Sequence, residues 1–156
     1  MNWRKVDECW RAFASDNKLK FDQSDDNFLY GVRTEYELTL TRPNYSLTFL
    51  GDMKKSTEGY NRYRTKLFIK ELKSNCLNFD EVIDSRFLFI FKNHYKDIIK
   101  ADLLELIRKH NAHKIIRTNF GFEIRYDYLF DKSNDFLDGI KLADEIAKRA
   151  SRYHHV

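Results

Sequence analysis

The chain has 156 residues, a length that fits one domain of ordinary size. Hydrophobic residues make up 42% of the chain and aromatic residues 15%, enough to bury a core without disulfides or a structural metal. The 28 basic and 24 acidic residues give a net charge of +4, which permits an anionic partner but does not require one.

The sequence predicts a cytoplasmic protein with no membrane partner. No apolar run approaches the ~18 residues of a membrane span, and the first residues lack the apolar stretch of a signal peptide. The two cysteines, Cys9 and Cys76, lie far apart and form no disulfide framework. With one proline and five glycines there is no linker, so we expect a single domain, 1–156, with residues 151–156 as a disordered tail.

The first segment predicts an amphipathic helix that stops near residues 15–17. Its apolar residues recur at helical spacing: Trp3, Val6, Trp10, Phe13 and Ala14. The spacing of Trp3 and Trp10 suits packing on a sheet or an exposed groove-binding face, and the sequence does not separate the two.

Residues 28–41 alternate between apolar and polar side chains and predict a strand. Turn residues at 42–44 and a resumed alternation through Phe49 complete a hairpin. The polar stretch 51–59 predicts an exposed loop, and residues 60–72 predict a further long strand.

The second half of the chain predicts more strands and two helices. Residues 75–85 suggest a connection with one helical turn, and residues 86–92 suggest a strand buried at the sheet centre. A helix is expected at 95–110 and a hairpin at 114–118 and 122–129, with Tyr126 and Tyr128 at core spacing. The last helix is expected to begin at Ser133 or Asn134.

These elements predict an α+β fold. A single antiparallel sheet of about five to seven strands would be packed by an N-terminal, a middle and a C-terminal helix, in a two-layer sandwich. The order of elements resembles that of small secretion-chaperone-like domains, without a residue motif that supports a family.

The least ordinary feature is a basic strand face formed by Arg62, Arg64, Lys66 and Lys70. Same-face residues on a strand lie about 6.6–6.8 Å apart, near the phosphate spacing of one nucleic-acid strand. Together with Arg33 or Arg125 on neighbouring strands, this face predicts anion or nucleic-acid binding. The alternative, which the near-equal charges favour, is a face neutralised across the strands by acids at Glu35, Glu37, Glu123 and Asp127.

Two further patterns suggest metal sites. Asp52, Glu71 and Lys73 resemble the acid and acid-x-Lys set of a metal-dependent phosphodiesterase, although a chain with 33% charged residues produces such triplets by chance. His94, His110 and His113 lack a further ligand, and His110 fits a helix C-terminus better than a zinc site.

No catalytic residues are therefore predicted, and no metal or cofactor. Neither cysteine has a neighbouring base, and no glycine-rich phosphate loop or hydrolase motif is present. The leading hypothesis is a non-enzymatic protein-interaction module, self-associating as a homodimer or chaperone-like. The alternative is a nucleic-acid-binding domain that uses the basic strand face, and a metal-dependent phosphodiesterase comes third.

Overall fold

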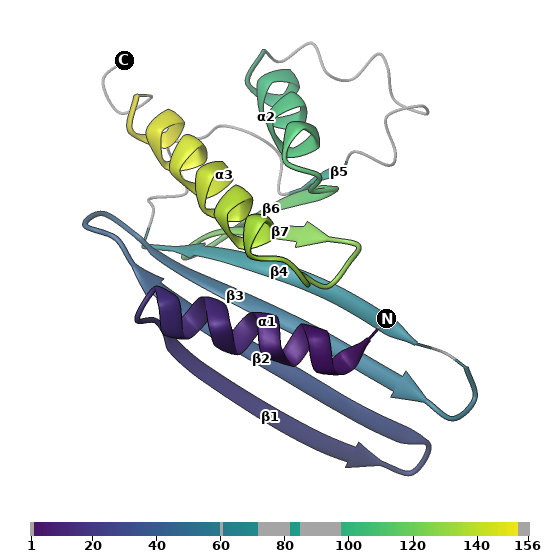
Figure 1. The fold of residues 1–156 in the computed structure, drawn as a ribbon. Helices are drawn as coiled ribbons and strands as arrows, with labels where there is room; N and C mark the ends of the chain where they lie inside the picture. The colour runs from purple at the N-terminus through teal and green to yellow at the C-terminus, as the bar shows by residue number, and fades with distance from the viewer. Residues whose placement is uncertain (1, 60, 72–81, 85–97, 153–156) are drawn as a thin grey trace.

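A computed structural model describes residues 2–59, 61–71, 82–84 and 98–152 (Figure 1). They form three helices and seven strands: α1 (Trp3–Asp16), β1 (Lys20–Phe28), β2 (Gly31–Thr41), β3 (Ser46–Ser56), β4 (Arg62–Lys70), β5 (Val82–Asp84), α2 (Ile98–Lys109), β6 (Lys114–Thr118), β7 (Gly121–Tyr126) and α3 (Ser133–Arg152).

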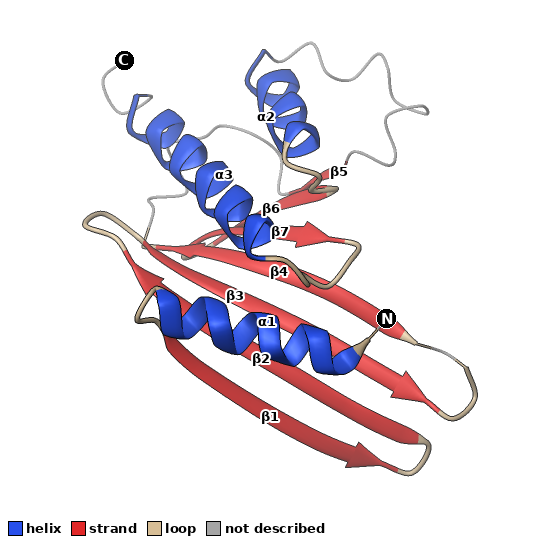
Figure 2. Ribbon diagram, in the orientation of Figure 1, coloured by secondary structure: helices blue, strands red, loops and turns tan. Residues whose placement is uncertain are grey.

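The strands form one antiparallel sheet in the order β1-β2-β3-β4-β7-β6-β5 (Figure 2). The meander β1 to β4 pairs strand by strand along the chain, and β4 then pairs with β7 of the C-terminal hairpin. The strand β4 thus lies at the middle of the sheet and joins its two halves. This arrangement confirms the predicted α+β fold with one antiparallel sheet and three helices.

Among the described residues, the helices lie on one face of the sheet, and no helix covers the other face, which is called the open face below (Figure 1). The core between the layers is built around Phe136 of α3, whose ring centroid lies 4.9 Å from that of Trp10 and 4.4 Å from that of Phe13. The Trp10 Nε1–H group also donates a 2.9 Å hydrogen bond to the carbonyl oxygen of Phe130. Trp10 is fully buried, whereas Trp3 remains 38% exposed, so only one of the two tryptophans belongs to the core.

The predicted strand 28–41 is in fact the end of one strand, a turn and a second strand. Phe28 ends β1, Leu29 and Tyr30 form the turn, and β2 begins at Gly31. The sequence analysis did not predict β1, because its residues KFDQSDDNF carry little apolar alternation. As an edge strand packed on few neighbours, β1 does not need that alternation.

The prediction of a loop at 51–59 is wrong. The strand β3 continues to Ser56, with Gly51 and Met53 buried on the helix side and Asp52 buried on the open side. Gly51 hides the alternation because it offers no apolar side chain to the pattern. A glycine is required there, since a Cβ atom would lie 2.8 Å from the Trp10 ring.

Other predicted boundaries move by a few residues. The strand β4 is shorter than 60–72, the second hairpin strand ends at Tyr126 and not at 129, and α2 lies within the predicted 95–110. The short strand β5 replaces part of the predicted connection 75–85, while the predicted strand 86–92 lies outside the described residues. α3 extends to Arg152, two residues into the predicted tail.

None of the helices among the described residues is both long and apolar enough to cross a membrane.

The close contact of Gly51 with α1 gives a test of the fold. In Gly51→Ala, the added methyl group would meet Trp10 and, at 2.9 Å, the Leu129 side chain. We expect this overpacking to lower the free energy of unfolding by about 1–3 kcal/mol in urea denaturation. The control Ser24→Ala, on the exposed edge strand β1, should change it by less than about 0.5 kcal/mol. An unchanged midpoint in Gly51→Ala would show that α1 does not pack on β3 as described.

Candidate anion-binding site

The basic residues of β4 lie together on the open face of the sheet. Thr65, Leu67 and Ile69 are buried beneath the helices, so the residues between them point to the opposite side. This alternation places the four predicted residues on that open face: Arg62, Arg64, Lys66 and Lys70. The predicted basic strand face is therefore present as a surface.

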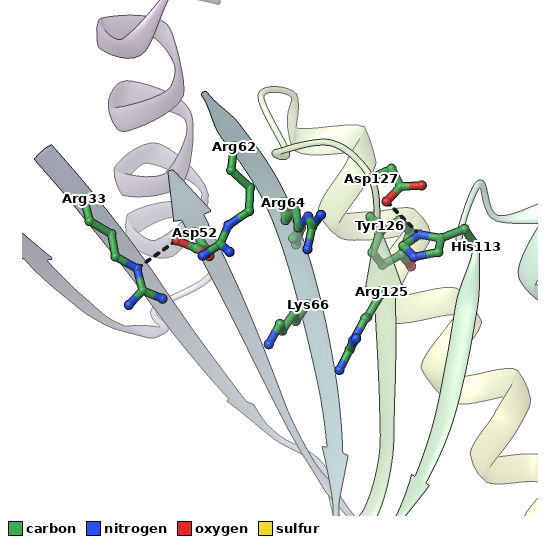
Figure 3. A pocket seen from close by; sticks show the side chains of 10 residues that line it. Arg33, Asp52, Arg62, Arg64, Lys66, His113, Arg125, Tyr126 and Asp127 are labelled. Atoms are coloured by element: carbon green, nitrogen blue, oxygen red, sulfur yellow. Dashed lines mark hydrogen bonds and ion pairs between the residues drawn. The ribbon is translucent and has the colours of Figure 1, made fainter. Parts of the chain in front are cut away.

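A pocket of about 190 Å³ opens on this face between β2 and β6 (Figure 3). The lining comes from five strands, β2, β3, β4, β7 and β6, and from residues next to them. The lining residues are Arg33, Asp52, Arg62, Arg64, Thr65, Lys66, His113, Arg125, Tyr126 and Asp127. The pocket includes three of the four predicted residues. Lys70 lies at the far end of β4, opposite Ser46 of β3, and does not line it.

On one side of the pocket, a buried carboxylate holds two guanidinium groups. Asp52 Oδ1 accepts a 3.0 Å hydrogen bond from Arg33 Nε, and Asp52 Oδ2 accepts a 2.6 Å hydrogen bond from Arg62 Nη2. The Asp52 side chain is only 7% exposed, while those of Arg33 and Arg62 are about 40% exposed. The hydrogen bond to Asp52 raises the pKa of the Arg33 guanidinium above its ordinary value.

On the other side of the pocket, Glu123 of β7 likewise pairs with two cations. Its Oε1 atom lies 2.6 Å from Arg125 Nε and 3.7 Å from Lys66 Nζ. Glu123 is largely buried, with a 13% exposed side chain, and the two cations reach past it toward solvent. The sheet therefore carries two nearly buried acids, each beneath a pair of cations.

Arg64 lies between these two clusters and is exposed. Its cross-strand neighbour on β3 is Asp52, the acid that would ordinarily pair with it. Both carboxylate oxygens of Asp52 are taken by Arg33 and Arg62, which approach from either side. Within the described part of the chain, Arg64 consequently has no ion pair and no side-chain hydrogen bond.

The predicted neutralisation of the basic strand face is therefore partial. Glu123 of β7 pairs with Lys66 of β4, as the cross-strand alternative predicts, whereas Glu35 lies 2.7 Å from Arg33 of its own strand, β2. Asp127 instead lies 3.5 Å from His113 Nδ1. Arg64 remains the unpaired cation of the pocket lining.

Two neutral residues, Thr65 and Tyr126, also line the pocket; they lie opposite each other in the strand register, with their side chains on the helix side of the sheet. The Thr65 hydroxyl accepts a 3.0 Å hydrogen bond from the Phe130 backbone N–H, which fixes the segment that follows β7. Tyr126 is 1% exposed, as its core spacing predicts, and its hydroxyl lacks a hydrogen-bond partner among the described residues. Burial, more than the nearby acids, raises the pKa of the Tyr126 phenol far above its ordinary value, so the group stays protonated.

The phosphodiesterase set predicted from the sequence does not assemble. Asp52 lies within β3 and pairs in register with Arg64, whereas Glu71 follows the opposite end of β4, next to Ser46↔Lys70. Six residues of strand separate these positions, or about 20 Å. Lys73 lies outside the described residues, and the Asp52 oxygens are occupied by arginines and not available to a metal.

The histidine and cysteine candidates also form no metal site among the described residues. His110 follows the end of α2 and lies 3.0 Å from Asp138 on α3, a contact between helices. His94 and Cys76 are not described, and burial raises the pKa of the Cys9 thiol, which makes it less reactive. The described residues contain no group of three potential metal ligands.

Sequence reasoning missed that Asp52 and His113 line this pocket. Asp52 is placed by the register of three strands, and its partners Arg33 and Arg62 lie 19 and 10 residues away in the chain. The available signal for Asp52 was an acid within a strand whose side chains otherwise alternate. Gly51 concealed this signal because it interrupts the alternation.

Comparison with known proteins gives no functional assignment. No protein-family model, curated protein or solved structure matches this chain.

The buried acid gives a test of the site's construction. In Asp52→Asn, the carboxylate that neutralises Arg33 and Arg62 is lost, and two partly buried cations face each other. We expect the free energy of unfolding to fall by about 1–3 kcal/mol in urea denaturation. Glu35→Gln, which removes a single half-exposed pair with Arg33, should cost less than about 1 kcal/mol. Equal effects of the two variants would contradict the central role of Asp52.

Proposed function

We propose that this chain is a non-enzymatic binding module that holds an anionic group of a partner protein on the open face of its sheet. The observation that carries this proposal is Arg64, an unpaired guanidinium within the described residues, placed between two satisfied acid-centred clusters. A guanidinium binds a carboxylate or phosphate through two parallel hydrogen bonds. The fixed neighbours of Arg64 prepare the pocket for such a group before any partner arrives.

The size of the pocket favours one group of a larger partner over a whole small molecule. Pockets for small ligands usually measure about 300–1,000 Å³ and bury most of the ligand. At about 190 Å³, this pocket is smaller, and most of its cations are between 30% and 45% exposed. A single anionic side chain that projects from a partner surface fits these dimensions.

A single-stranded nucleic acid is the second candidate, because the spacing of Arg62, Arg64 and Lys66 along β4 follows its phosphates. Two observations weaken it. Arg62 and Lys66 already share carboxylates with their neighbours, which lowers the charge available to a phosphate row. On β4, the open face adds only Phe68, which is half-buried, as a surface for base stacking.

Self-association through the β1 edge of the sheet fits the observed charges less well. The edge strand β1 carries Asp22, Asp25 and Asp26, and pairing with a second copy would bring these acids together. Acidic edges of this kind protect sheets from pairing with one another. The predicted homodimer stays a prediction, which light scattering on the purified protein would test.

Binding to defined anionic probes tests the proposed function. We expect a labelled acidic peptide to bind at low salt in fluorescence anisotropy, more tightly than an oligothymidylate of the same charge. Arg64→Ala should weaken the peptide complex about 10- to 100-fold, because it removes hydrogen bonds between charged groups. Arg108→Ala is the matched control, since Arg108 is an exposed arginine on α2, away from the open face.

Comparing the two variants also distinguishes binding at a specific site from nonspecific electrostatic attraction. If Arg108→Ala weakens binding as much as Arg64→Ala, the peptide is held by net charge alone and the proposal fails. If the oligothymidylate binds more tightly than the peptide and depends on Arg64, the nucleic-acid candidate replaces it.

A further inference from the structure

Among the described residues, the open face carries opposite charges on its two halves. Side chains directly opposite each other in an antiparallel pair lie on the same face, so the register assigns residues to the open face. On β1 and β2 this face holds four acids and two bases: Asp22, Asp26, Glu35 and Glu37, with Lys20 and Arg33. On β4 and β7 it holds five bases and one acid: Arg62, Arg64, Lys66, Lys70 and Arg125, with Glu123. One half of the face is therefore acidic and the other half basic.

One row of residues across the sheet repeats this polarity strand by strand, and it is called the charged row below. Its members are consecutive register partners on β1, β2, β3, β4 and β7: Asp22, Glu37, Leu50, Lys66 and Arg125. The charged row therefore reads acid, acid, leucine, base, base. Reversing its direction puts a base where each acid stood and keeps Leu50 at the centre.

Neighbouring charges of the charged row repel each other within one chain. Two acids lie opposite each other on β1 and β2, and two cations on β4 and β7, arrangements that destabilise a sheet. Diagonal contacts relieve part of this repulsion, since Lys20 Nζ lies 2.9 Å from Asp22 and Glu123 contacts both cations. Glu37 is exposed and, like Arg64, has no ion pair within the described part of the chain. Each half of the face thus keeps one charge without a partner.

Building on the proposed function, we propose that the partner on the open face is a second copy of this chain. The two copies would pack face to face, related by a twofold axis that runs parallel to β3 and passes above Leu50. Given the strand order in Figure 2, this axis places β2 of one copy above β4 of the other, and β1 above β7. Such a contact uses the same patch on both copies, so every pairing occurs twice.

The rotation keeps each residue at its own level along the strands, so the charged row meets itself in reverse. Glu37 of one copy then faces Lys66 of the other. Asp22 faces Arg125 in the same way, and Leu50 meets its own counterpart at the axis. Every charge of the row is thereby opposed by a charge of the other sign, which favours binding and fixes the register of the two copies.

The same rotation supplies the anion that Arg64 lacks. Glu35 and Arg64 both pair in register with Asp52, so Glu35 of one copy lies opposite Arg64 of the other. Glu35 contacts Arg33 at 2.7 Å within its own chain and keeps further acceptor sites on its carboxylate. The anionic group of the proposed function is then the Glu35 carboxylate. The following row holds cations on β2, β3 and β4, so the contact ends before it, where the twist of the sheets separates the copies.

Uncharged side chains lie beside the charged row on its other side. Thr39, Thr48 and Phe68 are consecutive register partners on β2, β3 and β4. The twofold axis places Thr39 of one copy opposite Phe68 of the other. With Leu50 these residues form a small uncharged centre that is flanked by ion pairs, as in the core and rim of a protein interface.

The concentration dependence of the mass of the whole chain, measured by light scattering and sedimentation equilibrium, tests this inference. We expect a dimer with a dissociation constant on the order of 100 µM, because the uncharged centre is small. Glu37→Lys and Lys66→Glu each put like charges together twice in the dimer and should weaken it at least about 100-fold. The control Glu105→Lys makes the same charge change on an exposed residue of α2, on the helix side, and should leave dimerisation unchanged.

An equimolar mixture of the two charge-reversed variants tests the pairing itself. In the mixed dimer, the two substituted side chains oppose each other with opposite charges, and the native Glu37 and Lys66 form the second pair. We expect this mixture to dimerise about as tightly as the native chain, although neither variant dimerises alone. Melting curves show in advance that each variant is folded.

The outcomes separate this inference from the proposed function. If the native chain stays monomeric well above 100 µM, if Glu37→Lys dimerises like the native chain, or if the folded variants fail to dimerise on mixing, the inference is overturned. Binding of the acidic peptide that depends on Arg64 would then still support the proposed function with a different partner. If Arg64→Ala weakens neither dimerisation nor peptide binding, both proposals fail.

Discussion

The open face depends on a carboxylate that is buried although it lies on the solvent side of the sheet. Asp52 accepts one hydrogen bond on each oxygen, from Arg33 and Arg62, and this pairing offsets the cost of its desolvation. The same pairing removes Asp52 as a partner for Arg64, its neighbour in the strand register. The surface is consequently not a uniform basic strip. It is a set of fixed ion pairs around one guanidinium that, among the described residues, stays available.

On the opposite face of the sheet, packing by the helix layer holds in place the strands that carry these ion pairs. Because Gly51 has no side chain, the Trp10 ring packs directly against β3. The Trp10 Nε1–H group donates a hydrogen bond to the carbonyl oxygen of Phe130, in the segment that links β7 to α3. Thr65 holds the Phe130 backbone from the sheet. The position of β7 against β4 is thereby fixed near the pocket.

The sequence predicted the fold well where side chains alternate and poorly where they do not. The face shared by Arg62, Arg64 and Lys66 followed directly from the period of β4. The extension of β3 was missed because Gly51 interrupts the pattern, and β1 was missed because an exposed edge strand needs little apolar character. The site was only half predictable. Which acid neutralises which cation depends on register and on diagonal neighbours, so the sequence suggested Asp52 only as a metal ligand, whereas the core position of Tyr126 was predicted from its spacing.

The most direct test of this account is the mobility of the individual arginine side chains in the free protein. Nitrogen-15 relaxation of the Nε–H groups reports it residue by residue. The account predicts that Arg33 and Arg125, whose Nε–H groups bond to Asp52 and Glu123, are rigid with slowly exchanging Nε–H protons. Arg64 should be mobile with rapid exchange. A rigid Arg64 that is hydrogen-bonded to Asp52, with Arg33 mobile instead, would contradict the central claim.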